Sequence, residues 1–132
     1  MSKDRAERFL REFSHWASGQ SDIQAVALVG SYARGTATEA SDVDLVVVAN
    51  QPGLYLQDRS WARAFGKILR QQVENYGKLI SLRIQYEDQL EVEYGLTDQS
   101  WAAIPLDEGT REVISGGMNV LFERSPLLSR HT

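Results

Sequence analysis

Two aspartates separated by one residue, Asp42 and Asp44, stand at the start of an apolar run that ends at residue 48. Successive side chains of a strand point to opposite faces, so both carboxylates lie on one face, with their Cα atoms roughly 6.5–7 Å apart. Two carboxylates at that spacing can share a pair of divalent ions, which lie about 3.5–4 Å apart in two-metal sites. Oxygen ligands suit Mg²⁺ or Mn²⁺, and Mg²⁺ takes phosphate oxygens as further ligands. The pair therefore predicts a metal site for a phosphorylated substrate.

A second motif, Gly30–Ser31, ends the preceding apolar run over residues 23–30. A glycine lets the backbone approach a ligand closely, because no Cβ intervenes. The N–H groups of the following turn, together with the Ser31 hydroxyl, can bind an anion. We therefore expect the carboxylates to bind metal and the metal to bind a triphosphate. The P-loop is disfavoured: Gly30 and Gly35 have its glycine spacing, but Thr36 stands where that motif requires lysine.

The spacing of apolar residues predicts the elements that must position these motifs. Apolar residues recur at helical intervals in residues 3–18, 58–75 and 107–116. Short apolar or alternating runs predict strands over residues 23–30, 42–48, 79–86, 90–96 and 118–123. The third and fourth strands flank a three-residue loop, as in a β-hairpin. This order predicts an α/β fold with a mixed β-sheet and helices mainly on one face.

The composition limits the partners of the protein. A chain of 132 residues is most simply one domain, residues 1–132. The 14 Lys and Arg against 18 Asp and Glu give a net charge of −4, which disfavours nucleic acid except as a small acceptor. The absence of cysteine excludes disulfides and thiolate metal sites. No apolar run approaches the roughly 18 residues of a membrane helix, and no signal core is present, so we expect a cytoplasmic protein without membrane contact.

The spacing of Gly30–Ser31, ten intervening residues and then Asp42-Val43-Asp44-Leu45 resembles the motif of the nucleotidyltransferase superfamily with the DNA polymerase beta-type catalytic fold. The segment GSYARGTATEASDVDL is especially similar to small prokaryotic (minimal) nucleotidyltransferases and to antibiotic nucleotidyltransferases. The resemblance implies a polymerase beta-like fold. It also implies an enzyme that transfers a nucleoside monophosphate, most simply AMP from ATP, to an acceptor hydroxyl. In that enzyme Asp42 and Asp44 would hold two Mg²⁺, with Mn²⁺ as a substitute.

The same resemblance implies a third carboxylate on a neighbouring strand. Glu91 and Glu93 are the candidates, because they share one face of the strand over residues 90–96. The family often has aspartate here, but a glutamate can still ligate metal or accept a proton from an acceptor hydroxyl. We favour Glu93, which lies nearer the C-terminal half of the strand and before Gly95. Glu91 stays open as the alternative.

The phosphate contacts follow from the same comparison. Gly30 and Ser31 would contact the β- and γ-phosphates of the nucleoside triphosphate. Arg34, the basic residue of the same loop, would either reach a phosphate or point into solvent.

Other hypotheses belong to different functional classes. The chain is alternatively an antitoxin-type interaction protein of a two-protein module, which binds or nucleotidylates a small helical partner, or a degenerate fold that binds nucleotide without turnover. We also expect a second polypeptide, in a homodimer or as a small helical partner, to complete the acceptor site. Leu127, Leu128 and the apolar residues 101–104 are expected to leave exposed surface for it; the alternative is that these residues cap the core.

Overall fold

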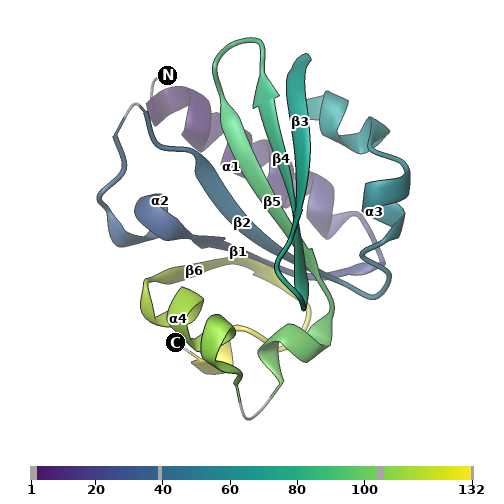
Figure 1. Cartoon of the computed structure of the whole chain (residues 1–132), viewed down its shortest axis with the longest axis vertical. Coiled ribbons are helices and arrows are strands. Elements are labelled where there is room, and N and C mark those ends of the chain that lie inside the picture. The colour runs from purple at the N-terminus through teal and green to yellow at the C-terminus, as the bar shows by residue number, and fades with distance from the viewer. Residues whose placement is uncertain (1–2, 39, 104–105, 132) are drawn as a thin grey trace.

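The structure, a computed structural model, describes residues 3–38, 40–103 and 106–131. Its centre is a mixed sheet of six strands in the order β3-β4-β5-β2-β1-β6 (Figure 1). The strands are β1 (Ile23–Val29), β2 (Val43–Ala49), β3 (Ile68–Asn75), β4 (Leu79–Tyr86), β5 (Glu91–Thr97) and β6 (Met118–Glu123). The α-helices are α1 (Lys3–Ser18), α2 (Gly30–Arg34), α3 (Leu54–Gln57) and α4 (Glu108–Ser115). The 3₁₀ helices are η1 (Ser60–Phe65), η2 (Gln99–Ala102) and η3 (Ser129–His131).

The sheet is mixed because one pair of strands is parallel. Strand β2 runs parallel to β5, while the pairs β1–β2, β1–β6, β3–β4 and β4–β5 are antiparallel. The predicted α/β class, the mixed sheet and the hairpin of β4 and β5 are therefore confirmed. Among the described helices, none is long and apolar enough to cross a membrane.

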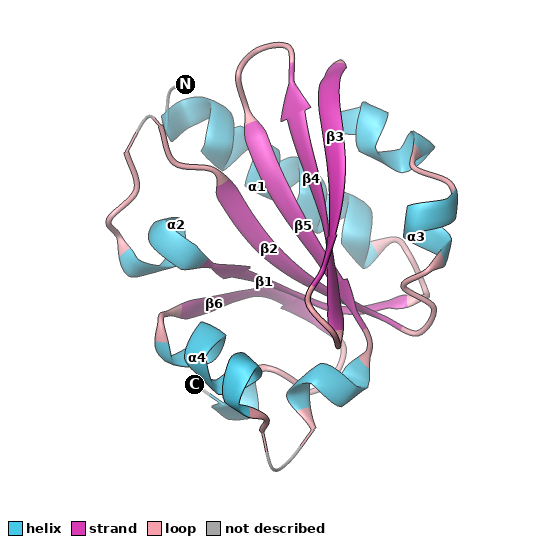
Figure 2. Ribbon diagram, in the orientation of Figure 1, coloured by secondary structure: helices cyan, strands magenta, loops and turns pink. Residues whose placement is uncertain are grey.

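One face of the sheet is covered by α1 and η1 (Figure 2). Helix α1 forms because its apolar residues recur three or four positions apart, and Ala6, Phe9, Phe13 and Ala17 of this stripe are buried. Phe9 and Phe13 of this stripe stack on each other with ring centroids 5.7 Å apart, and both contact Tyr94 of β5. The same cluster takes Val43 and Leu45 from β2. Because side chains alternate along a strand, Asp44 must point to the opposite face.

Among the described residues, those that pack on the opposite face gather at its β1–β2–β6 end. Trp101 and Ala102 of η2, together with Leu127 and Leu128, pack there on Val46 and neighbouring strand residues. Leu127, Leu128 and Trp101 are 9 %, 0 % and 4 % exposed. The prediction that this apolar set leaves a surface for a partner is therefore wrong for those residues, because they close the second core; Ile104 lies outside the described residues.

The predicted helix over residues 58–75 is also wrong. Its first half forms η1, and its second half forms the edge strand β3. Gly66 ends η1 with a φ angle of 155°, and a Cβ there would lie 2.9 Å from Cδ1 of Tyr86. The backbone groups beyond it pair instead with β4. Leu69 and Val73, which completed the apparent helical stripe, are 52 % and 43 % exposed.

The aromatic layer under α1 should dominate stability. Phe9 is fully buried, and its replacement by alanine leaves a cavity, so we expect Phe9→Ala to lower the free energy of unfolding by about 3–5 kcal/mol. Leu54, which is 50 % exposed, provides the control, and Leu54→Ala should change that quantity by about 0.5 kcal/mol or less. Urea unfolding monitored by tryptophan fluorescence measures both. Equal losses in the two variants would contradict this description of the core.

Candidate functional site

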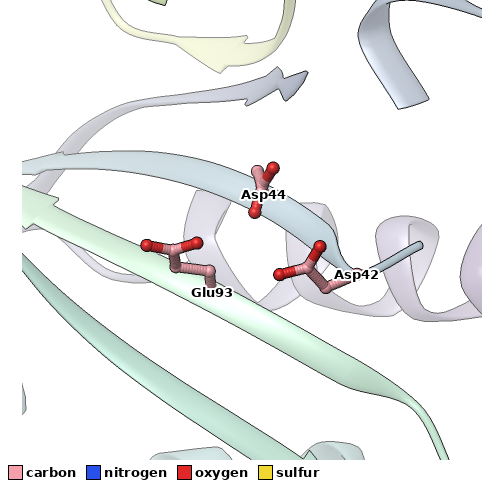
Figure 3. A group of neighbouring side chains, drawn as sticks. All are labelled: Asp42, Asp44 and Glu93. Atoms are coloured by element: carbon pink, nitrogen blue, oxygen red, sulfur yellow. The ribbon is translucent and has the colours of Figure 1, made fainter. Parts of the chain in front are cut away.

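Three carboxylates meet on the open face of the sheet, at the start of β2 and on β5 (Figure 3). Asp42 directly precedes β2, and Asp44 is its second residue. The parallel register sets Asp44 opposite Glu93. One oxygen from each of the three side chains lies within 4.8 Å of the other two. The structure thus brings together the two predicted aspartates and the favoured glutamate.

Asp44 has the most perturbed environment of the three. Burial, and then the negative charges of Asp42 and Glu93, raise the pKa of its carboxyl group to about 7, while Arg83 opposes the shift. Its Oδ1 atom is buried, and no described residue donates a hydrogen bond to it. An uncompensated buried oxygen beside two more carboxylates fits a divalent cation, because oxygen ligands are those that Mg²⁺ and Mn²⁺ prefer.

Gly30 lies against this carboxylate. It has a φ angle of 73°, which side chains rarely tolerate, and a Cβ there would lie 2.2 Å from Oδ2 of Asp44. The end of β1 therefore leaves the space that the Asp44 side chain occupies. Ser31 follows in α2, and its carbonyl oxygen accepts hydrogen bonds from the N–H groups of Gly35 and Thr36. The tight turn keeps the Gly30–Ser31 backbone beside the carboxylates.

Arg83 on β4 is a site residue that the sequence interpretation missed. Its guanidinium group forms ion pairs with four carboxylates: Glu93 at 3.1 Å, Asp42 at 3.6 Å, Glu91 at 3.7 Å and Glu74 at 3.8 Å. The predicted hairpin already implies that Arg83 lies beside Glu93. A three-residue loop centred on residue 88 pairs Arg83 with Glu93, as the structure does.

Glu93 and Glu91 differ in their contacts. Glu93 accepts hydrogen bonds from the Ser81 hydroxyl at 2.8 Å and from Arg83 at 3.1 Å, which fix its carboxylate beside Asp44. Glu91 lies two residues earlier on the same face, against Nη1 of Arg83. Geometry therefore favours Glu93 as the third member of the cluster.

A cavity of about 550 Å³ opens beside the carboxylates, between the sheet and α4. Asp44 and Glu93 line one end, and Gly30 and Arg34 lie beside them. Leu79 and Trp101 contribute apolar wall. The Arg34 guanidinium, although exposed, donates a hydrogen bond to the Gly116 carbonyl at 3.4 Å at the side of this cavity. A larger hollow of about 980 Å³, between α1, η1 and β3, is lined by none of the three carboxylates.

Comparisons with known proteins bear on the family and the fold of this chain. Residues 6–100 match the model of the nucleotidyltransferase domain family. Among solved structures, that of an aminoglycoside 6-adenyltransferase from Bacillus subtilis is similar, with a TM-score of 0.59 and 18% sequence identity. The match covers 77% of this chain and 37% of that one, so this chain spans little more than a third of its length. No curated protein matches the sequence. The predicted polymerase beta-like nucleotidyltransferase fold is confirmed.

The raised pKa of Asp44 predicts how stability depends on pH in protein freed of divalent ions. The folded state holds the Asp44 proton up to about pH 7, whereas an unfolded chain releases it near the ordinary value of 3.8. The stabilising contribution of this proton is therefore present below about pH 4 and lost as pH rises through about 7. Relative to wild type, Asp44→Asn should gain in melting temperature between about pH 5 and about pH 8. A constant difference, measured in EDTA, would contradict the assignment.

The close approach of Gly30 to Asp44 yields a matched pair of variants. Gly30 and Gly35 have φ angles of 73° and 76°, so alanine is strained by about 1–2 kcal/mol at either position. Only at Gly30 does the new Cβ displace a carboxylate, since nothing lies within 4 Å of one at Gly35. We expect Gly30→Ala to weaken Mn²⁺ binding at least about tenfold and Gly35→Ala to leave it unchanged. Calorimetric titration with Mn²⁺ measures this, and equal affinities in the two variants would refute it.

Proposed function

The chain belongs to the nucleotidyltransferase family, and on that premise we propose that it transfers AMP from ATP to an acceptor hydroxyl and releases pyrophosphate. The observation that carries the proposal is the meeting of Asp42, Asp44 and Glu93 beside the Gly30 backbone. In this reaction the acceptor oxygen bonds to the α-phosphorus, the bond from the α-phosphorus to the bridging oxygen of pyrophosphate breaks, and the acceptor proton leaves to a base.

The donor set supports a divalent metal centre. Asp42 and Asp44 would hold two Mg²⁺, or Mn²⁺ in their place, and Glu93 would ligate one of them. The buried, unpartnered Oδ1 of Asp44 favours this assignment over a simple solvated acidic patch. When bound, such ions neutralise phosphate charge and lower the pKa of an oxygen that they bind.

Glu93 is the residue best placed to handle the proton. It shares the cluster with Asp44, and Ser81 and Arg83 hold it in one orientation. A carboxylate fixed in this way can accept the acceptor proton as the new bond forms. Arg83 balances part of the negative charge of the cluster, so the three carboxylates can stay together before any nucleotide binds.

The cavity supplies the nucleotide site in this proposal. Gly30 and Ser31 contact the β- and γ-phosphates through backbone N–H groups and the Ser31 hydroxyl, and Arg34 contacts a phosphate from the side. The base and sugar occupy the space toward α4, where Leu79 and Trp101 form apolar wall. Catalysis then comes from positioning and charge neutralisation.

The identity of the acceptor is open to more than one class of molecule. The similar Bacillus subtilis protein is named for an aminoglycoside, and it is far longer than this chain. A second polypeptide at the acceptor site, whether another copy or a small helical protein, stays a prediction, as does a cytoplasmic location.

Transfer from ATP can be tested with ATP that is radiolabelled at either the α-phosphate or the γ-phosphate. With Mg²⁺ and candidate acceptors that include aminoglycosides and cell-lysate protein, label from the α-phosphate should enter an acceptor, whereas label from the γ-phosphate should leave as pyrophosphate. Asp44→Asn should lower the rate by about 100-fold or more, since loss of a metal ligand exceeds the effect of its supporting residues. Asp4→Asn, an exposed change on α1, is the matched control.

Binding provides a readout that does not depend on the acceptor. Mg²⁺-ATP should raise the melting temperature of wild type and of Asp4→Asn by mass action, and should have little effect on Asp44→Asn. Transfer of γ-label, or an equal stabilisation of all three proteins by Mg²⁺-ATP, would refute the proposal.

A further inference from the structure

Strand β3 is an open edge of the sheet. It stands at one end of the strand order and is hydrogen-bonded to β4 on one side (Figure 1). Five successive residues, 69–73, are exposed. An edge of this kind presents unpaired N–H and C=O groups, which make it a template for another strand unless it is covered. The length of eight residues allows a substantial ladder.

The other edge strand, β6, differs. Five of its six residues are partly buried, and Asn119 is the exposed one. The carboxylate of Glu123 at its end accepts hydrogen bonds from the N–H groups of Leu128 and Ser129, so the following segment folds back against it. Within the part of the chain that the structure describes, β3 is therefore the more exposed of the two edges.

The sequence of β3 is complementary to itself in one antiparallel register. Within β3, Arg70 and Glu74 stand two positions on either side of Gln72. If two copies pair about a twofold axis at Gln72, Arg70 of each copy lies opposite Glu74 of the other. Their partners on β4, Gln85 and Ser81, lie on one face of the sheet, so both charged side chains point to that face. Opposite charges directly across a strand pair stabilise it, and like charges destabilise it.

We propose that β3 pairs with β3 of a second copy about a twofold axis at Gln72, so that two sheets join into one. The same register covers apolar surface on the other face. Val73, which is 43 % exposed in the single chain, comes opposite Gln71 of the second copy and diagonal to its Val73. Diagonal side chains in a sheet are about 7–8 Å apart at their Cα atoms and come within reach of each other.

The pairing also reaches the carboxylate cluster. Glu74 is one of the four carboxylates that contact Arg83, with Oε1 3.8 Å from Nε. Arg70 of the second copy adds a cation on the outer side of Glu74. Glu74 then interacts with Arg70 of the second copy as well as with Arg83. More of the positive charge of Arg83 is therefore available to Asp42 and Glu93. The proposal does not rest on nucleotidyl transfer, since the pairing needs only the edge strand.

Charge reversal tests the register directly. Sedimentation equilibrium at tens of micromolar should show wild type as a dimer. Arg70→Glu places two pairs of like charges across the axis, and so does Glu74→Arg, so each variant should dimerise roughly tenfold or more weakly. A double variant, Arg70→Glu with Glu74→Arg, restores both attractive pairs and should dimerise like wild type.

Mixing the single variants gives the sharpest result. Arg70→Glu copies carry two acidic residues on the edge, and Glu74→Arg copies carry two basic ones. An equimolar mixture should therefore form heterodimers at a concentration at which each variant alone dimerises weakly. Arg8→Glu, an exposed reversal on α1, controls for net charge, and circular dichroism checks that each variant is folded. A monomeric wild type, a dimer indifferent to the single reversals, or a mixture that stays monomeric would overturn the proposal.

Discussion

Repulsion between neighbouring carboxylates is the constraint around which this structure is arranged. The parallel pairing of β2 and β5 puts Asp44 opposite Glu93, and Asp42 lies on the same face. Negative charges at this separation repel each other and disfavour a compact state. Arg83 of β4 opposes that repulsion from the adjacent strand, with four carboxylates around one guanidinium group. The remaining imbalance falls on Asp44, whose pKa is raised by burial and by the charges of Asp42 and Glu93.

The sheet explains how such a cluster is sustained. On its other face, the same strands are anchored by the aromatic layer under α1, where Phe9, Phe13 and Tyr94 are in contact. Tyr94 follows Glu93 on β5, so one residue belongs to the core and its neighbour to the carboxylates. The favourable free energy of apolar burial on one face thus offsets the electrostatic repulsion on the other. Gly30 completes the arrangement, since any side chain there would expel the Asp44 carboxylate.

Local motifs of the sequence carried much of this arrangement. The spacing of Asp42 and Asp44 and the place of Gly30 needed only strand alternation and the reach of a backbone without Cβ. The hairpin loop already contained the pairing of Arg83 with Glu93, although no feature of Arg83 alone distinguishes it from an ordinary exposed arginine. The helix predicted over residues 58–75 is wrong because helical spacing is a local signal, whereas the pairing of β3 with β4 is decided by tertiary contact. The predicted exposure of Leu127 and Leu128 is wrong for the same reason, because the sequence does not reveal that the chain returns to cover β1 and β2.

The parallel pair has a consequence for the order in which the molecule assembles. Strands β3, β4 and β5 follow one another in the chain and pair as sequential neighbours, so they need only short loops to close. Asp44 and Glu93 meet only when β2 docks on β5, across a long intervening segment that must first lose its chain entropy. We therefore expect the carboxylates to come together in a non-local step of folding, so that their meeting marks the joining of the two halves of the sheet.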